Sequence, residues 1–220
     1  LPREILSPGR LTLTLLAAPP PERSPMKLYL IRHGQSEGNR LQVFHGQFDY
    51  PLTAQGRQEA LLCGEKLRDI PLTHCYASDL QRARDTAALA LQGRDVPITL
   101  LPALREQNVG DMEGLTWAEM ERLHPELLDG FLHRWFDTTP PGGESGREME
   151  GRVSAALEEI LAKDQDALIA AHFGTLSLML HILGIARKEE LFTKPFFIHQ
   201  GCYTAIELQN GRATLLSLNA

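Results

Sequence analysis

The chain has 220 residues, of which 43% are hydrophobic and 23% are charged, and its formal net charge is −6. This length suffices for one well-buried core, and the composition is that of a globular protein rather than a disordered or membrane-embedded one. No run of lysine or arginine could track a nucleic-acid backbone. Cys63, Cys75 and Cys202 lie far apart and form no paired metal-ligand spacing, which favours a reduced, cytoplasmic protein.

The first 25 residues differ from the rest of the chain. They hold six prolines, and their only apolar run, residues 11–18, is too short to span a bilayer. Arg3 and Arg10, which precede this run, are compatible with a signal peptide. Met26 is compatible with a translation start at that residue. We expect residues 1–25 to be a flexible or accessory extension and residues 26–220 to form one domain.

From Met26 onward, apolar strand-like runs alternate with helical patterns. The predicted strands are residues 27–32, 74–77, 98–101 and 167–171, and the main predicted helices are residues 53–70, 78–91, 145–163 and 175–183. Capping boxes that begin at Ser78, Thr116 and Ser145 mark three helix starts. Residues 203–208 and 213–218 suit a terminal hairpin around Asn210-Gly211. This alternation predicts an α/β fold with a single open, mostly parallel sheet and helices on both of its faces.

Polar residues stand where four of these strands end. Arg32 and His33 follow the first strand, Arg82 lies in the helix after the second, Glu106 follows the third, and His172 follows the fourth. Ligands of open α/β sheets bind beyond the carboxyl ends of the strands, so one pocket is expected there. Arginine forks and helix N-termini favour phosphate, and a neutral imidazole can attack it. The alternatives are a solvated helix arginine for Arg82 and a hydrogen-bonded core histidine for His172.

Six segments, in order, resemble the histidine phosphatase superfamily, also called the phosphoglycerate-mutase-like family. They cover residues 30–39 (LIRHGQSEGN), 46–53 (GQFDYPLT), 78–83 (SDLQRA), 104–114 (LREQNVGDMEG), 140–145 (PPGGES) and 172–174 (HFG). The family pattern is histidine then glycine, whereas here Phe173 is inserted between them. The acid-phosphatase branch places an aspartate after this histidine, so Phe173 argues against that branch.

The resemblance implies a phosphoglycerate-mutase-like fold and a phosphohistidine mechanism. It makes His33 the nucleophile and Glu106 the acid that protonates the leaving oxygen, with Glu113 as the competing acid. The groups that would hold the phosphoryl oxygens are Arg32, Arg82 and His172, with Asn39 as an additional neutral donor. A nearby phosphate would raise the pKa of the glutamate, so the best turnover is expected at mildly acidic to neutral pH. The resemblance implies neither a metal nor another cofactor.

Three functions are compatible with these residues. The first is a metal-independent phosphomonoester phosphatase acting on small phosphorylated metabolites, and the second is a cofactor-dependent phosphoglycerate mutase. Gly38, where mutases usually carry tryptophan, and the two cations Arg122 and Arg134 in residues 116–139 favour the phosphatase. The third is a non-catalytic protein that binds a phosphorylated ligand, which the complete set of site residues disfavours.

The substrate is left open by the sequence. Candidates are α-ribazole phosphate, phosphoserine, nucleotides or a broad set of esters. The segment expected to cover the pocket carries four large aromatic residues, Trp117, Phe131, Trp135 and Phe136. Residues at such spacing are more often core, but one or two of them facing the pocket would suit a bulky or aromatic leaving group. No nucleic-acid or membrane partner is expected, and a homodimer would be ordinary for such a chain.

Overall fold

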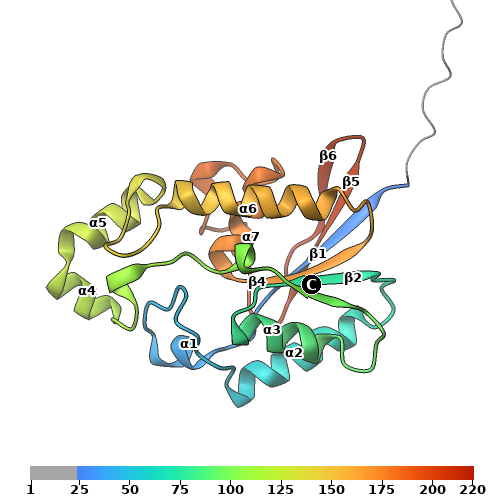
Figure 1. Ribbon diagram of the computed structural model, residues 1–220, viewed down its shortest axis with the longest axis horizontal. Coiled ribbons are helices and arrows are strands. Elements are labelled where there is room, and N and C mark those ends of the chain that lie inside the picture. The colour runs from blue at the N-terminus through green and yellow to red at the C-terminus, as the bar shows by residue number, and fades with distance from the viewer. Residues whose placement is uncertain (1–23) are drawn as a thin grey trace, which may run out of the picture.

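A computed structural model describes residues 24–220, which form one six-stranded sheet covered by helices (Figure 1). The strands are β1 (Met26–Arg32), β2 (His74–Ala77), β3 (Ile98–Leu100), β4 (Ala167–Ala171), β5 (Tyr203–Gln209) and β6 (Arg212–Ser217), in the spatial order β3-β2-β4-β1-β5-β6. The first four are parallel, and β5 and β6 add an antiparallel hairpin beside β1. The predicted fold class and terminal hairpin are confirmed. The extension predicted for residues 1–25 lies outside the described residues, apart from residues 24 and 25.

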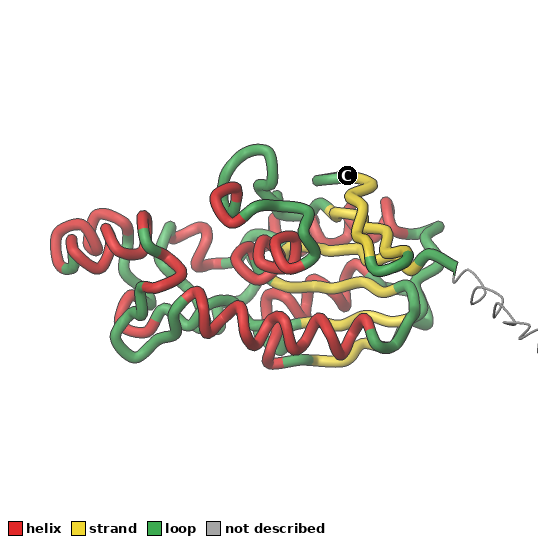
Figure 2. The backbone as a smooth tube through the Cα atoms, turned by 90° about the horizontal axis from the view of Figure 1, so that it is seen from above, coloured by secondary structure: helices red, strands yellow, loops and turns green. Residues whose placement is uncertain are grey.

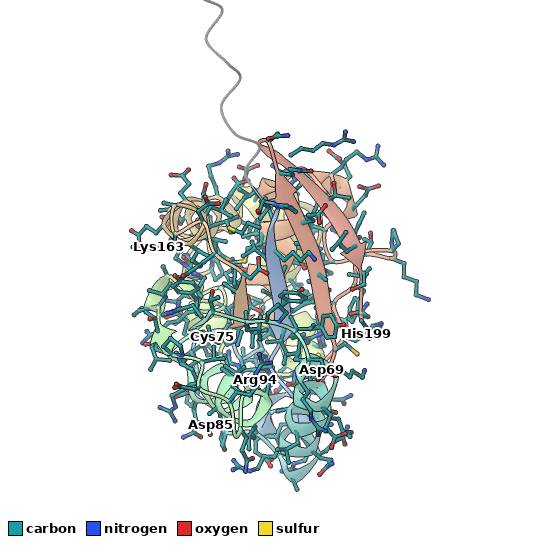
Figure 3. All side chains as sticks on the ribbon, turned by 90° about the vertical axis from the view of Figure 1, so that its right-hand side faces the viewer. Asp69, Cys75, Asp85, Arg94, Lys163 and His199 are labelled. Carbon is teal, nitrogen blue, oxygen red and sulfur yellow. The ribbon has the colours of Figure 1, made fainter. Side chains whose placement is uncertain are left out.

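The helices lie on both faces of the sheet, as predicted. They are α1 (Glu37–Leu41), α2 (Ala54–Leu67), α3 (Gln81–Ala90), α4 (Trp117–Leu123), α5 (Pro125–His133), α6 (Gly146–Leu161) and α7 (Phe173–Ile182). Figure 3 views the molecule from the side, with Asp85 of α3 below the sheet and Lys163, just after α6, above it. Short 3-10 helices occur at Pro102–Leu104, Gly110–Met112, Trp135–Asp137 and Lys188–Glu190. In the part of the chain described, no helix is long and apolar enough to cross a membrane.

The central strands are buried on both faces, and this decides how the helices pack. In β1, Leu28 and Leu30 join the core beneath α6 and α7, while Tyr29 and Ile31 join the core beneath α2 and α3. Every residue of β4 is buried. A strand covered on both faces needs apolar residues at successive positions, which explains the unbroken apolar run that marked β4 in the sequence.

Two of the three predicted capping boxes are confirmed and one is wrong. Thr116 caps α4 with Glu119, and Ser145 caps α6 with Glu148. Ser78 caps nothing, because α3 begins at Gln81 with Leu80 at its N-cap. The Ser78 hydroxyl instead lies 2.9 Å from His172 Nε2, so a partner distant in sequence has displaced the local pattern.

One end of the molecule holds the elements that would cover a ligand. The helices α4 and α5 lie together beyond the carboxyl ends of the parallel strands, at the left of Figures 1 and 2. The short α1 lies on the same side, because β1 runs toward it. The strand ends, α1 and α4 therefore frame the region in which the sequence predicts a pocket.

Candidate active site

The two histidines of the predicted site lie side by side. The backbone amide of His33 donates to Ala171 O at 3.0 Å, and that of Ser78 donates to Ala170 O at 2.9 Å. The end of β4 therefore anchors the residues that follow β1 and β2. The ring centroids of His33 and His172 are 5.1 Å apart, and both side chains are buried. The structure thus brings together residues that are far apart in sequence at the predicted strand ends.

Hydrogen bonding decides which nitrogen of His33 carries a lone pair. His33 Nδ1 lies 2.8 Å from Gly34 O, and a carbonyl can only accept, so Nδ1 carries the proton. Burial and then the charges of Arg82 and Arg32 hold the pKa of His33 well below 6.5. The ring is therefore neutral near pH 7, with its lone pair on Nε2. This is the form required of a nucleophile.

Arg82 is buried rather than solvated, so the alternative of a surface helix arginine is wrong. Its Nη1 donates to Phe48 O at 2.9 Å, and its Nη2 donates to Gly46 O at 2.6 Å and to His45 O at 3.2 Å. Burial lowers its pKa to about 10, and it remains charged at neutral pH. The loop at residues 45–48 thus fixes a guanidinium beside His33.

Arg32 is held from two sides. Its Nη1 donates to Ile198 O at 2.9 Å, and its guanidinium carbon lies 4.8 Å from the ring centroid of Phe173 and 5.9 Å from that of Phe197. Cation–π contact of this kind keeps a planar guanidinium in place without consuming its donors. Phe173, the insertion after His172, therefore packs on the arginine that precedes His33.

Three polar atoms of this cluster are buried and make no hydrogen bond. They are Arg32 Nε, Arg82 Nε and His172 Nδ1, and only two other buried side-chain polar atoms of residues 24–220 share that condition. Buried polar groups in proteins are almost always paired, because leaving one unpaired costs free energy. The two guanidinium nitrogens are hydrogen-bond donors that carry positive charge. Together with the neutral ring of His33, they make a site suited to binding an anion.

The two candidate acids have different surroundings. Glu106 accepts from Gly174 N at 3.0 Å through Oε2 and from Gln107 N at 3.1 Å through Oε1, and its charge acts on both Arg32 and Arg82. Glu113 instead accepts from Gln47 N at 2.7 Å and Phe48 N at 3.3 Å. Burial raises the pKa of Glu113, while its carboxylate holds the loop that binds Arg82. This geometry favours Glu106 as the group beside the reacting centre.

Asn39 is oriented by a network on its oxygen. Asn39 Oδ1 accepts from Ser36 N at 3.0 Å and from Gln200 Nε2 at 2.7 Å. The amide nitrogen Nδ2 is the group left to donate toward a ligand, in keeping with the predicted neutral donor.

His45 lies next to His33 but was not predicted from the sequence as a site residue. Its ring centroid lies 6.4 Å from that of His33, and its Nδ1 donates to Val43 O at 2.8 Å. Burial is the main cause that lowers its pKa to about 4, so it is neutral near pH 7. A Cβ on Gly38 would lie 2.6 Å from the His45 ring, which explains why a large residue is absent from that position. The only sequence signal was the position of His45 directly before the matching block that starts at Gly46.

A cleft of about 540 Å³ adjoins this cluster through Asn39 and His45. It is lined by α1, the loop after it and the start of α4, namely Gly38, Asn39, Leu41, Gln42, Val43, His45, Thr116, Trp117 and Ala118. Trp117 is 51% exposed, and its ring centroid is 4.6 Å from that of Phe44. This volume is in the range typical of small-molecule sites.

The other aromatic residues considered for the cover do not line this cleft. Phe131 packs edge-on against Phe44, and Phe136 is buried in the main core. Trp135 covers Gly146 and donates its Nε1 to Gln107 Oε1 at 2.7 Å. Trp117 is therefore the aromatic side chain of the four that lies on the cleft. Within residues 24–220, no group of three or more His, Cys, Asp or Glu side chains could hold a metal ion.

This chain is similar to known proteins over most of its length. The profile of the Histidine phosphatase superfamily (branch 1) matches residues 28–220. An adenosylcobalamin/alpha-ribazole phosphatase of Salmonella typhimurium is 34% identical over 197 residues, which are 89% of this chain and 96% of that protein. A 2,3-bisphosphoglycerate-dependent phosphoglycerate mutase of Bartonella henselae is 36% identical over 176 residues, 76% of this chain and 85% of the mutase. The crystal structure of an alpha-ribazole phosphatase from Shigella flexneri superposes with a TM-score of 0.82 at 31% identity, covering 89% of this chain and 96% of that one.

Proposed function

This chain belongs to the histidine phosphatase superfamily (branch 1), and from this we propose that it hydrolyses phosphomonoesters of small metabolites through a phosphohistidine formed on His33. The observation that carries the proposal is the neutral His33, whose free Nε2 lone pair lies among three buried nitrogens without hydrogen-bond partners. A phosphoryl group bound there would receive donors from Arg32 and Arg82 on its oxygens, where charge spreads in the transition state.

The reaction has two steps. In the first, the Nε2 lone pair forms a bond to phosphorus as the bond to the ester oxygen breaks, and Glu106 gives its proton to the departing alkoxide. In the second, Glu106 takes a proton from water, the water oxygen attacks phosphorus, and the N–P bond breaks to return the lone pair to His33. Inorganic phosphate then leaves, and the enzyme regains its starting state.

The phosphatase is preferred over a mutase for a reason visible in the cleft. A mutase must hold a sugar acid beside the phosphohistidine and return the phosphoryl group to it. The cleft presents Leu41, Val43 and Trp117 rather than cations that would bind a carboxylate. We therefore extend the proposal to substrates whose leaving group is planar and apolar, which can stack on Trp117. The relatives named alpha-ribazole phosphatases are in keeping with this.

The first test is hydrolysis of a phosphomonoester panel in excess chelator. The panel includes an aryl phosphate, phosphoserine, nucleotides, α-ribazole phosphate and 3-phosphoglycerate. Phosphate release should be lost in His33→Ala and kept in His74→Ala, since His74 begins β2 at the opposite end of the strand and bonds to Thr99. Release that persists in His33→Ala would reject the phosphohistidine route. Exchange of phosphate between 3-phosphoglycerate and a bisphosphorylated primer, without hydrolysis, would establish the mutase instead.

The cleft has its own test. Trp117→Ala should lower kcat/KM for aromatic substrates by about 3- to 10-fold relative to small alkyl phosphates, as expected for the loss of one aromatic contact. Leu123→Ala is the matched control, because Leu123 is an exposed apolar residue of the same helix and does not line the cleft. An unchanged ratio in Trp117→Ala would remove the aromatic leaving group from the proposal while leaving the hydrolysis intact.

A further inference from the structure

Ser78 is a buried serine at the centre of the proposed site. Its side chain is completely buried, and its hydroxyl oxygen lies 2.9 Å from His172 Nε2. The same oxygen accepts from the backbone amide of Leu80 at 3.3 Å. The sequence suggested a helix cap for this residue, so its actual contact calls for another explanation.

The hydrogen on the hydroxyl decides the direction of the contact with His172. A serine hydroxyl has one proton to donate, and Ser78 already accepts from Leu80. If His172 Nε2 donated to Ser78, the buried hydroxyl proton would have no acceptor and His172 Nδ1 would be an unprotonated, unpaired nitrogen. If Ser78 donates to His172 Nε2, the hydroxyl is fully used and the ring proton must sit on Nδ1. The second arrangement leaves one buried group unpaired, the Nδ1 N–H, whereas the first leaves two, the hydroxyl proton and the Nδ1 lone pair.

We propose that Ser78 is a positioning residue that donates to His172 Nε2, and that it thereby makes His172 Nδ1 an N–H donor to the phosphoryl group. Nδ1 is on the opposite side of the ring from Ser78, in a ring whose centroid is 5.1 Å from that of His33, and it makes no hydrogen bond within the protein. The inference rests on the proposed function, because the acceptor for the Nδ1 N–H of His172 is an oxygen of the bound phosphoryl group.

The two histidines would then hold the same tautomer, protonated on Nδ1, but would present opposite nitrogens to the phosphoryl group. The Gly34 carbonyl accepts a hydrogen bond from the Nδ1 N–H of His33, which leaves the Nε2 lone pair free. The Ser78 hydroxyl donates to the Nε2 lone pair of His172, which leaves the Nδ1 N–H free. Tautomers matter here because burial and neighbouring cations lower the pKa of both rings well below 6.5. A neutral ring has one donor and one acceptor, so an incorrect tautomer would turn a lone pair toward the oxygens of the phosphoryl group.

The decisive measurement is the tautomer of His172 in the intact protein. Long-range proton–nitrogen NMR on protein labelled with ¹⁵N-histidine distinguishes a protonated from an unprotonated ring nitrogen, and the signal is assigned by its loss in His172→Gln. At neutral pH the unmodified protein should show Nδ1 protonated and Nε2 unprotonated. The reverse pattern would overturn the proposal without any variant of Ser78.

The variants test the role of the hydroxyl. Ser78→Ala should shift His172 toward the tautomer protonated on Nε2, weaken inhibition by inorganic phosphate, and lower kcat by about 10-fold, less than the full loss of an oxyanion donor because the ring can still sample the other tautomer. Ser78→Thr keeps the hydroxyl and should restore the wild-type tautomer. Ser177→Ala is the matched control, since Ser177 is equally buried and its hydroxyl has no hydrogen bond.

The outcomes separate this proposal from the proposed function. An unchanged Nδ1-protonated ring in Ser78→Ala would show that Ser78 does not set the tautomer. A wild-type protein that hydrolyses no phosphomonoester yet has the expected tautomer would instead count against the proposed function. If Ser78→Thr folds poorly because of its added methyl group, the spectrum of the unmodified protein and that of Ser78→Ala still decide the question.

Discussion

Adding one methyl group at Gly174 should disable the candidate acid Glu106 without any change to the sequence at Glu106 itself. Gly174 is the second residue of α7, and its amide donates to Glu106 Oε2 at 3.0 Å. A Cβ built on Gly174 would lie 2.4 Å from Glu106 Oε1, whereas ordinary contact begins at 3.4 Å. Relief of this overlap in Gly174→Ala requires the carboxylate to move by about 1 Å, and a displacement of that size can cost about 100-fold in rate.

The loss should depend on the leaving group. An alkoxide needs a proton as it departs, while a nitrophenolate leaves without one, so a displaced acid slows the first far more than the second. We expect kcat for an alkyl phosphate to fall by about 100-fold in Gly174→Ala and kcat for p-nitrophenyl phosphate by about 10-fold or less. The assay is steady-state phosphate release for both substrates, with thermal unfolding as the check on folding.

Gly151→Ala provides the matched control. Gly151 lies in α6, and a Cβ there meets nothing within 4 Å, so the variant should keep full activity and gain about 1 kcal/mol of stability from alanine's higher helix propensity. Retention of alkyl phosphatase activity within threefold in a folded Gly174→Ala would refute the assignment of Glu106 as the acid. Equal losses for both substrates would place the damage at the phosphate pocket instead.

Three further predictions concern stability. Burial lowers the pKa of His33, His45 and His172, so at acid pH the unfolded chain binds protons that the folded state does not. The free energy of unfolding is therefore highest above about pH 6.5, where these histidines are neutral in both states. It should decline as the pH falls toward the His45 pKa of about 4, by about 1.4 kcal/mol per pH unit for each histidine. Urea midpoints measured from about pH 7 to pH 5 should therefore fall, and His45→Gln should reduce that slope by the share of one histidine; an unchanged slope would contradict the burial argument. Arg152 donates to the carbonyls of Ala103, Arg105 and Glu106 and forms a partly buried ion pair with Glu144, so Arg152→Met should destabilise the fold by about 2–3 kcal/mol in chemical denaturation. A loss below about 1 kcal/mol would show that this pair is dispensable. Ser145→Ala removes the cap of α6 and should cost about 1 kcal/mol, with Thr116→Ala as a second cap for comparison; a wild-type melting temperature would refute the capping role.

Much of the fold could be predicted because the decisive signals are local. Strands covered on both faces need continuous apolar runs, and 167–171 is such a run. The boxes at Thr116 and Ser145 formed as predicted, because each serine or threonine finds its partners within one helical turn. The location of the candidate site could also be predicted from the sequence. Parallel strands bring their carboxyl ends to one edge of the sheet, so the polar residues that follow several strands meet there.

The rest depended on contacts that no local pattern encodes. Ser78 satisfies the capping pattern in sequence, but its partner His172 is 94 residues away. His45 enters the site because Gly38 leaves room for its ring and because its carbonyl binds Arg82. Phe197 reaches Arg32 from a loop near the end of the chain, where its spacing relative to the motifs carried no signal.

The buried strand β4 has a consequence for how sequence changes would be tolerated. Its last two residues, Ala170 and Ala171, carry no chemistry, yet their carbonyls hold the backbones of Ser78 and His33 in register, and His172 follows directly. Both alanines are fully enclosed, so a larger side chain at either position would push the strand and carry all three attached residues with it. In a mutational scan scored by activity, we therefore expect substitutions of Ala170 and Ala171 by larger residues to be tolerated as poorly as substitutions of the histidines.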